Sequence, residues 1–169
     1  MTDSSIAKYR AGSEADLPEI AAIYAHYVRE TVTTFELDAP DVAEWRRRFA
    51  AITAAGLPFL VAESEGHLAG YAYCAPWKQR PAYRHTAENS IYLAPWAIGR
   101  GLGGGLLDGL LSACRDRGLR EIVAVIADSG DLASPALHRS RGFVDAGRLR
   151  RVGYKHDRWI DTVLMQLSL

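Results

Sequence analysis

This chain of 169 residues has few cysteines, no net charge and no cluster of metal-ligating residues in its sequence. The two cysteines, Cys74 and Cys114, lie inside apolar runs, which indicates buried reduced thiols rather than a disulfide framework. The formal net charge is zero, so charge gives no reason to expect nucleic acid or a membrane surface as a partner. The five histidines are scattered without metal-ligand spacing, and we expect no metal.

Long hydrophobic runs, internal repeats and low-complexity tracts are also missing. No apolar run approaches the roughly 18 residues that mark a transmembrane helix. The first ten residues lack the apolar segment of a signal peptide, so we expect a cytoplasmic protein. The length suits one domain over residues 1–169, and an apolar content of 49% suffices for a hydrophobic core.

Glycine, by contrast, is concentrated in one place, where it fills five of the seven positions 99–105. A short β-branched and aromatic segment, 90–93, precedes this stretch. Leucines at helical spacing follow it as far as Gly118, which predicts a strand, a turn and an amphipathic helix. The free N–H groups and the dipole at the start of that helix favour a phosphate. A flexible loop before an ordinary core helix is the alternative.

The rest of the chain alternates between strand and helix patterns. Strands are predicted over 6–10, 58–64, 68–75, 122–127, 143–152 and 159–167, with turns at 65–67 and 153–157. Helices are predicted to begin near 13–16, 38–40 and 134–135. Arg46, Arg47 and Arg48 fall in the second of these helices, where we expect a solvated face rather than a basic binding patch.

The sequence resembles a known family at the glycine-rich stretch. A strand, then Gly-Arg-Gly-Leu-Gly at 99–103, then an amphipathic helix is similar to the acetyl-CoA loop of the GCN5-related N-acetyltransferases. The similarity extends from about Tyr9 to Gln166 and is closest to the phosphinothricin and methionine sulfoximine N-acetyltransferase branch. It is carried by the segments 26–36, 75–95, 123–143 and 152–166. It implies a mixed α/β fold, with a central, mostly antiparallel, splayed sheet of about seven strands and about four helices.

The resemblance also implies a function. Acetyl would move from the co-substrate acetyl-CoA to the α-amino group of a small amino acid or analogue, by direct attack in a ternary complex. The partners would be this small-molecule amine acceptor and a second copy of the chain in a homodimer. Two alternatives stay open: a module of this fold that binds acyl-CoA with little or no turnover, and an acetyltransferase for another amine, such as a peptide N-terminus or a polyamine.

The residues expected to bind the coenzyme follow from the same resemblance. The strand that would pair with the pantetheine arm contains Ile91, Tyr92 and Leu93. The loop that would hold the pyrophosphate contains Gly99, Arg100, Gly101, Leu102, Gly103 and Gly104. Asp131 belongs to a second coenzyme motif. The family usually has Arg or Gln in place of Ile98, a polar or basic residue in place of Gly104, and Asn in place of Asp131. We therefore expect weaker coenzyme binding, with Arg100 supplying charge.

The residues expected to bind the acceptor lie mainly in an irregular segment, 76–86, which is rich in aromatic and basic groups. Lys78 or Arg80 would pair with the acceptor carboxylate, because Arg suits bidentate pairing. The other candidates are wall or contact residues, namely Phe35, Trp77, Gln79, Tyr83, Asn89 and Ser90. A surface loop with solvated arginines is the alternative for this segment, and simple core packing is the alternative for Phe35.

Two residues are candidates for proton transfer. Glu88 begins an otherwise apolar segment, where partial loss of water would raise its pKa and make it a better base for the acceptor ammonium. The resemblance also places the catalytic glutamate there. His138 stands where relatives carry the acid that protonates the leaving thiolate. The alternatives are a glutamate that caps a turn or pairs with Arg84, and a helix histidine packed on the core.

Overall fold

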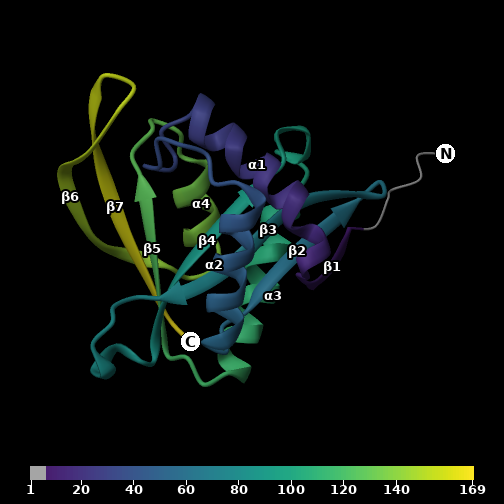
Figure 1. The fold of residues 1–169 in the computed structure, drawn as a ribbon. Helices are drawn as coiled ribbons and strands as arrows, with labels where there is room; N and C mark the ends of the chain where they lie inside the picture. The colour runs from purple at the N-terminus through teal and green to yellow at the C-terminus, as the bar shows by residue number, and fades with distance from the viewer. Residues whose placement is uncertain (1–6) are drawn as a thin grey trace.

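The computed structural model describes residues 7–169, and its centre is a sheet of seven strands in the order β1-β2-β3-β4-β5-β7-β6 (Figure 1). Neighbouring strands are antiparallel except for the parallel pair β4 and β5. The strands are β1 (Lys8–Ala11), β2 (Phe59–Ser64), β3 (His67–Pro76), β4 (Thr86–Leu93), β5 (Glu121–Ala127), β6 (Val144–Lys155) and β7 (Arg158–Ser168).

Four α-helices cover the two faces of this sheet: α1 (Leu17–Glu30), α2 (Val42–Ala54), α3 (Leu102–Asp116) and α4 (Ala133–Arg139). Side chains of α1 and α2 pack with alternate residues of β2 and β3 in one core cluster, where Trp45 is fully buried. The leucines of α3 pack with the intervening residues of those strands, and with β5 and β7, in a second cluster. Because successive strand residues point to opposite faces, the sheet separates the two clusters.

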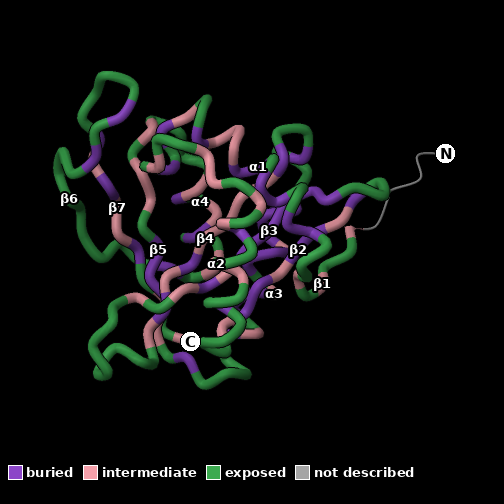
Figure 2. Tube along the Cα trace, viewed as in Figure 1, coloured by how far each residue is buried: buried purple, intermediate pink, exposed green. Residues whose placement is uncertain are grey.

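The β6–β7 hairpin differs from its prediction. Gly153, Tyr154 and Lys155 belong to β6 and pair with β7, so the turn is only His156 and Asp157 rather than 153–157. Both turn residues have positive φ, 49° and 57°, which suits a two-residue hairpin turn. Figure 2 shows that β6, the edge strand, is exposed along most of its length.

The predicted fold class is confirmed by the sheet and its helices. The predicted amphipathic helix is confirmed, with Gly118 at φ 74° just beyond its end, but it begins at Leu102, so Gly103, Gly104 and Gly105 belong to the helix and not to the turn before it. Ile6, expected to begin the first strand, lies outside the described residues. Within residues 7–169 no helix is both long enough and apolar enough to cross a membrane.

Candidate active site

Strands β4 and β5 separate in the middle of the sheet. They pair only over three positions, from Thr86 with Glu121 to Glu88 with Val123. Beyond Glu88 the two strands diverge, and a cleft of about 260 Å³ lies between residues 89–93 of β4 and 124–127 of β5. The outer partners of these strands, β3 and β7, continue along them, so only the inner edges lack a strand partner in this part of the sheet. An extended ligand could pair with such edges.

The predicted coenzyme residues gather around this cleft. Ile91, Tyr92, Leu93, Gly103 and Asp131 line it. The glycine-rich loop lies at one end, where α3 begins with Gly101 as its N-cap. Gly99 and Gly101 both have φ 79°, a left-handed conformation that side chains disfavour. The loop therefore presents the first N–H groups of α3, and these suit a phosphate.

Arg100 was predicted to supply positive charge for a coenzyme phosphate, but its guanidinium is paired within the protein. Its guanidinium donates to the Glu65 carboxylate at 2.6 Å and lies 5.4 Å from the centre of the Trp96 ring. Glu65 belongs to the turn between β2 and β3. The expectation that Arg100 supplies charge to a phosphate therefore stays a prediction, and it requires this ion pair to open.

Asp131 lies at the cleft and shapes the start of α4. Its carboxylate accepts a hydrogen bond from the backbone N–H of Ala133 at 2.9 Å. This contact occupies one carboxylate oxygen in a local side-chain turn just before α4, whose N-cap is Leu132. It gives the residue a structural role beside the coenzyme contact that the resemblance implies.

Glu88 is the last residue of β4 that pairs with β5. It does not itself line the cleft but directly precedes Asn89, the first β4 residue that does. Its side chain is half-buried. Burial raises the pKa of the Glu88 carboxyl, and the positive charge of Lys78 opposes part of that rise. A carboxyl with a raised pKa is a better proton acceptor near neutral pH than an ordinary one.

His138 is buried in α4, with only 2% of its surface exposed. Its Nδ1 lies 2.8 Å from the Ser134 carbonyl, which can only accept, so Nδ1 carries the proton. Its Nε2 lies 3.0 Å from the Asn89 side-chain amide and accepts from it. Burial lowers the pKa of His138, so the ring is neutral at pH 7.

The two candidate catalytic residues lie on opposite sides of β4. Asn89, which contacts His138, is adjacent to Glu88 in the strand, so their side chains point to opposite faces. Tyr92 faces α1 and α2, as Glu88 does, whereas Ile91 faces α3 as Asn89 does. The cleft between β4 and β5 therefore connects a Glu88 side with a His138 side.

The basic segment after β3 forms a separate hollow. Its walls are Trp77, Lys78, Gln79, Arg80 and Tyr83, together with Pro76, and none of these residues lines the cleft between β4 and β5. Within it the Lys78 ammonium lies 4.7 Å from the centre of the Trp77 ring. The segment is the loop that projects below the sheet in Figure 1. Asn89 and Ser90, by contrast, line the cleft itself.

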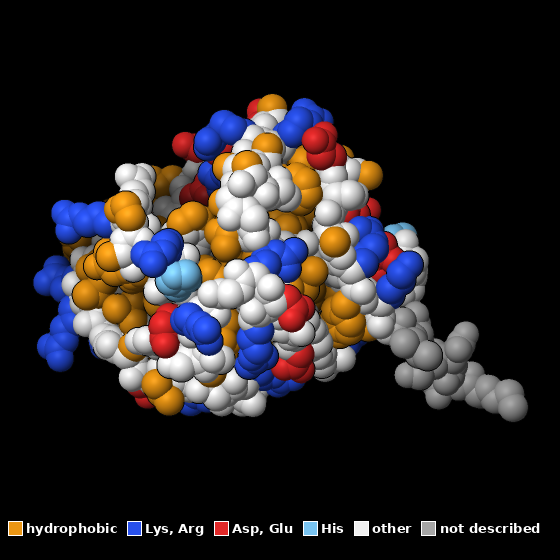
Figure 3. Space-filling view, turned by 90° about the horizontal axis from the view of Figure 1, so that it is seen from below, with side chains coloured by type: hydrophobic (Ala, Val, Ile, Leu, Met, Phe, Trp, Pro, Cys, Tyr) orange, Lys and Arg blue, Asp and Glu red, His pale blue; other side chains and the backbone are white. Residues whose placement is uncertain are grey.

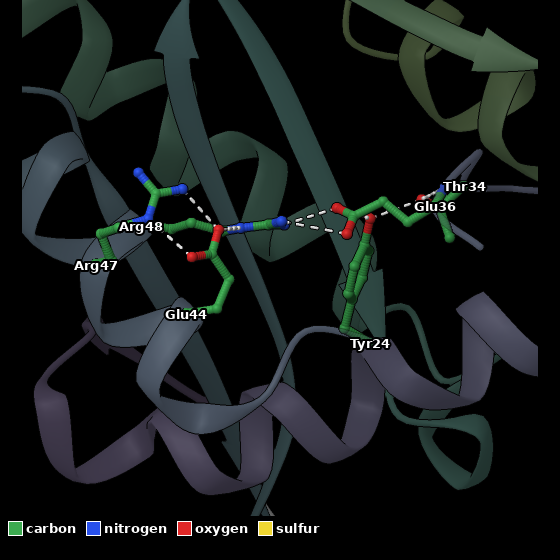
Figure 4. A network of polar contacts seen from close by, with 6 residues as sticks. All are labelled: Tyr24, Thr34, Glu36, Glu44, Arg47 and Arg48. Carbon is green, nitrogen blue, oxygen red and sulfur yellow. Dashed lines mark hydrogen bonds and ion pairs between the residues drawn. The ribbon is translucent and has the colours of Figure 1, made fainter. Parts of the chain in front are cut away.

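The segment between α1 and α2 is held by a polar network, drawn in Figure 4. Glu36 accepts hydrogen bonds from Arg48 at 2.6 and 3.1 Å and from the Tyr24 hydroxyl at 2.9 Å. The buried Lys155 ammonium donates to the Thr34 carbonyl at 2.8 Å. Phe35 then packs against Gly153, where any Cβ would lie 2.4 Å from the Phe35 ring.

Arg48 corrects our expectation of a solvated arginine face. Arg46 and Arg47 are more than half exposed and pair with Glu14 and Glu44. Arg48 is 28% exposed and joins Glu36 to Glu44, so it ties α2 to the loop before it. Helical spacing alone did not reveal this, because Glu36 lies outside the helix.

The comparison with protein families decides the identity of the fold. The sequence profile of the acetyltransferase (GNAT) domain matches residues 10–164. The chain belongs to the GNAT family of acetyltransferases. The family resemblance and the enzyme class, an acetyl-CoA-dependent N-acetyltransferase, are thus confirmed. In a GNAT acetyltransferase, the glycine-rich loop and the divergent strands are suited to acetyl-CoA.

Three similar proteins place the chain within the GNAT family. Phosphinothricin N-acetyltransferase of Alcaligenes faecalis is 51% identical over 160 residues, which cover 95% of this chain and 81% of the relative. L-methionine sulfoximine/L-methionine sulfone acetyltransferase of Pseudomonas paraeruginosa is 39% identical, covering 96% and 95%. A phosphinothricin acetyltransferase of Sinorhizobium meliloti, solved in complex with AcCoA, has a TM-score of 0.93 and 43% identity, covering 96% and 88%. The predicted branch is confirmed.

Proposed function

We propose that this GNAT enzyme transfers acetyl from acetyl-CoA to the α-amino group of a small amino acid or amino-acid analogue of the phosphinothricin or methionine sulfoximine type. The observation that carries the proposal is the half-buried Glu88, which stands where β4 and β5 separate. Glu88 is the base that an ammonium acceptor requires, and it lies next to a cleft that suits the coenzyme. The names and the high identity of the relatives support the acceptor class.

The residues of the cleft fit the coenzyme. The inner edge of β4 over residues 91–93 offers backbone groups to the amides of the pantetheine arm, and the Leu93 carbonyl there already accepts from the Tyr27 hydroxyl at 2.6 Å. The glycine-rich loop, residues 99–104, offers N–H groups to the pyrophosphate. The Oδ1 atom of Asn89 is buried and has no hydrogen-bond partner among residues 7–169. Because a buried acceptor without a partner is costly, it suits a ligand N–H in this cleft.

In the proposed reaction, Glu88 takes a proton from the acceptor ammonium, directly or through one water. The freed amine nitrogen bonds to the acetyl carbon and then gives up its second proton to solvent. The carbon–sulfur bond breaks, and the thiolate of coenzyme A leaves. A backbone N–H of β4 aimed at the thioester oxygen stabilises the negative charge that develops there. His138 supplies the proton to the thiolate. Since Nε2 of the neutral ring accepts from Asn89, this role requires His138 to take up a proton first.

The acceptor carboxylate is proposed to pair with Arg80 or Lys78. Both are exposed in the hollow below the sheet, and the charge of Lys78 already acts on Glu88. Trp77 and Tyr83 would provide the apolar wall, with Gln79 as a further contact. Asn89 and Ser90 would contact the acceptor from the cleft side, and Phe35, which packs against Gly153 outside the cleft lining, is a further proposed contact. A polyamine would be a poor fit for this basic hollow.

The acceptor class is tested by measuring release of the coenzyme A thiol with a panel of amines. Phosphinothricin and methionine sulfoximine should support thiol release. The corresponding amines that lack only the α-carboxylate should not, and neither should a polyamine. Arg80→Ala and Lys78→Ala should each raise the KM for the amino acids by about tenfold, because each removes a charge-assisted contact. Arg84→Ala, in the same loop, is the matched control.

Three outcomes would count against this assignment. Equal thiol release with the amine that lacks a carboxylate would show that no contact to the acceptor carboxylate is needed. Release with a polyamine or a peptide N-terminus alone would indicate another acceptor. Binding of acetyl-CoA without release for any amine would indicate a binding module.

We also propose that the protein acts as a cytoplasmic, single-domain enzyme that forms a homodimer. The β6–β7 hairpin supports the dimer, because its side chains Leu149, Val152, Tyr154 and Trp159 are each about half exposed. Large apolar side chains gathered on one edge favour a protein partner. Figure 3 shows hydrophobic and basic side chains side by side on the flank where β6 and β7 lie in Figure 1. Light scattering should give twice the monomer mass of 18.6 kDa.

A further inference from the structure

The first turn of α3 contains a cation that comes from another part of the chain. Gly104 is buried in this turn, and a Cβ built on it would lie 2.3 Å from Nη2 and 3.0 Å from Cζ of Arg141. Arg141 follows α4, 37 residues later in the sequence. Its guanidinium therefore lies in the space that a side chain at 104 would fill.

Two contacts hold Arg141 in this position. Its Nε and Nη2 donate to the Asp108 carboxylate, one turn further along α3, at 3.0 and 3.1 Å. Its Nη1 donates to the Ser140 hydroxyl at 2.8 Å. The Arg141 side chain is 28% exposed, against 53% for Arg139 at the end of α4, so it is packed against α3 while one edge still meets solvent. A guanidinium has five N–H donors, and these bonds occupy three.

The position of this cation matters because of what the loop must bind. The start of a helix carries partial positive charge, so a second cation there is unfavourable unless anions accompany it. Asp108 provides one anion, and a coenzyme phosphate on the loop would provide another. The two positions at which the family carries polar or basic side chains are here Ile98 and Gly104. Arg100, our first substitute for them, is paired with Glu65.

We infer that Arg141 is the side chain with which this protein binds a phosphate of the coenzyme, and that Gly104 is the gap that admits it. The inference rests on the use of acetyl-CoA and is independent of the acceptor. Arg141 brings a cation from just beyond α4 to the first turn of α3. Asp108 pairs with the guanidinium in the free protein and competes with the phosphate for it in the complex.

The test is the affinity for coenzyme A without any acceptor, measured by calorimetry. Arg141→Ala should weaken binding by about 10- to 100-fold, the loss expected for a charge-assisted hydrogen bond. Arg139→Ala is the matched control, since Arg139, at the end of α4, pairs with Asp145 of β6, and it should bind as the wild type does. Asp108→Asn keeps Arg141 and removes its competitor, so it should tighten binding.

The choice of ligand identifies the phosphate. If Arg141 contacts the pyrophosphate, Arg141→Ala loses affinity equally for coenzyme A and for 3′-dephospho-coenzyme A. If it contacts the 3′-phosphate, only coenzyme A shows the loss. The double variant with Gly104→Arg and Arg141→Ala should regain affinity in either case. Unchanged affinity of Arg141→Ala for both ligands would overturn the inference, as would weaker binding by Asp108→Asn, which remains decisive should Arg141→Ala fail to fold.

Discussion

Glu88→Gln should lower kcat by about 100-fold or more, since general base catalysis typically contributes two to four orders of magnitude. Glutamine keeps the shape of the side chain but cannot take the proton from the acceptor ammonium. The matched control is Glu121→Gln, a carboxylate in the first paired position of β5, where it accepts from Gln166 and Ser168. The measurement is thiol release at saturating acetyl-CoA and acceptor. A variant that retains the wild-type rate would place the base elsewhere.

The pH dependence of the Glu88→Gln variant gives a second check on the same residue. In the wild type, kcat/KM should rise with pH as Glu88 loses its proton, and burial places this step above the usual glutamate range. The variant should lose this step while keeping any dependence that comes from the acceptor amine itself. An unchanged acidic limb would assign that limb to another group.

The Glu88→Gln substitution should raise the stability of the fold although it lowers activity. The folded-state pKa of Glu88 is raised above that of the unfolded chain, so folding holds its proton more tightly. The stabilisation from this group is complete below the unfolded pKa and is lost as pH rises through the folded pKa. Above the folded-state pKa the wild type therefore contains a half-buried charge that glutamine lacks. We expect Glu88→Gln to unfold at a slightly higher temperature than the wild type above that pKa, a gain that shrinks as pH falls through it.

The parts of the site that the sequence predicted are local ones. The glycine-rich stretch predicted the start of α3 because Gly99 and Gly101 adopt φ values that suit glycine, a property of single residues. The partial burial of Glu88 was predictable because the segment that follows it, Ile91 to Leu93, is apolar and suits a central strand. Both signals lie within a few positions of the residue concerned.

The parts that the sequence did not predict depend on distant pairing. The separation of β4 from β5 after Glu88 is set by β3 and β7, which hold the two strands on their outer edges. Arg141 fills the gap at Gly104 only because α4 packs near the start of α3. Arg48 is not part of a solvated face as predicted, because it pairs with Glu36 of the preceding loop. No periodicity within one element carries such information.

His138 gives the second large expected effect. His138→Gln should lower kcat by about 100-fold if the ring protonates the leaving thiolate, the size typical of a positioned acid. Coenzyme A binding and the Arg141 contacts should persist, because His138 itself bonds to Ser134 and Asn89. A variant with full kcat and only a lower melting temperature would instead leave His138 as a buried support for Asn89.

The pH dependence separates these two roles of His138, because its folded-state pKa is lowered by burial. The unfolded chain then binds more protons than the folded chain as pH falls below the ordinary histidine pKa, so stability declines from about pH 6.5 downward. His138→Gln should remove this part of the acid sensitivity whichever role is correct. An acid role adds a loss of kcat in the wild type as pH rises through the lowered pKa, and the variant should lack that loss. If kcat of the wild type shows no such alkaline limb, the proton on the departing thiol comes from water, and the contribution of His138 is the hydrogen bond that holds Asn89 at the cleft.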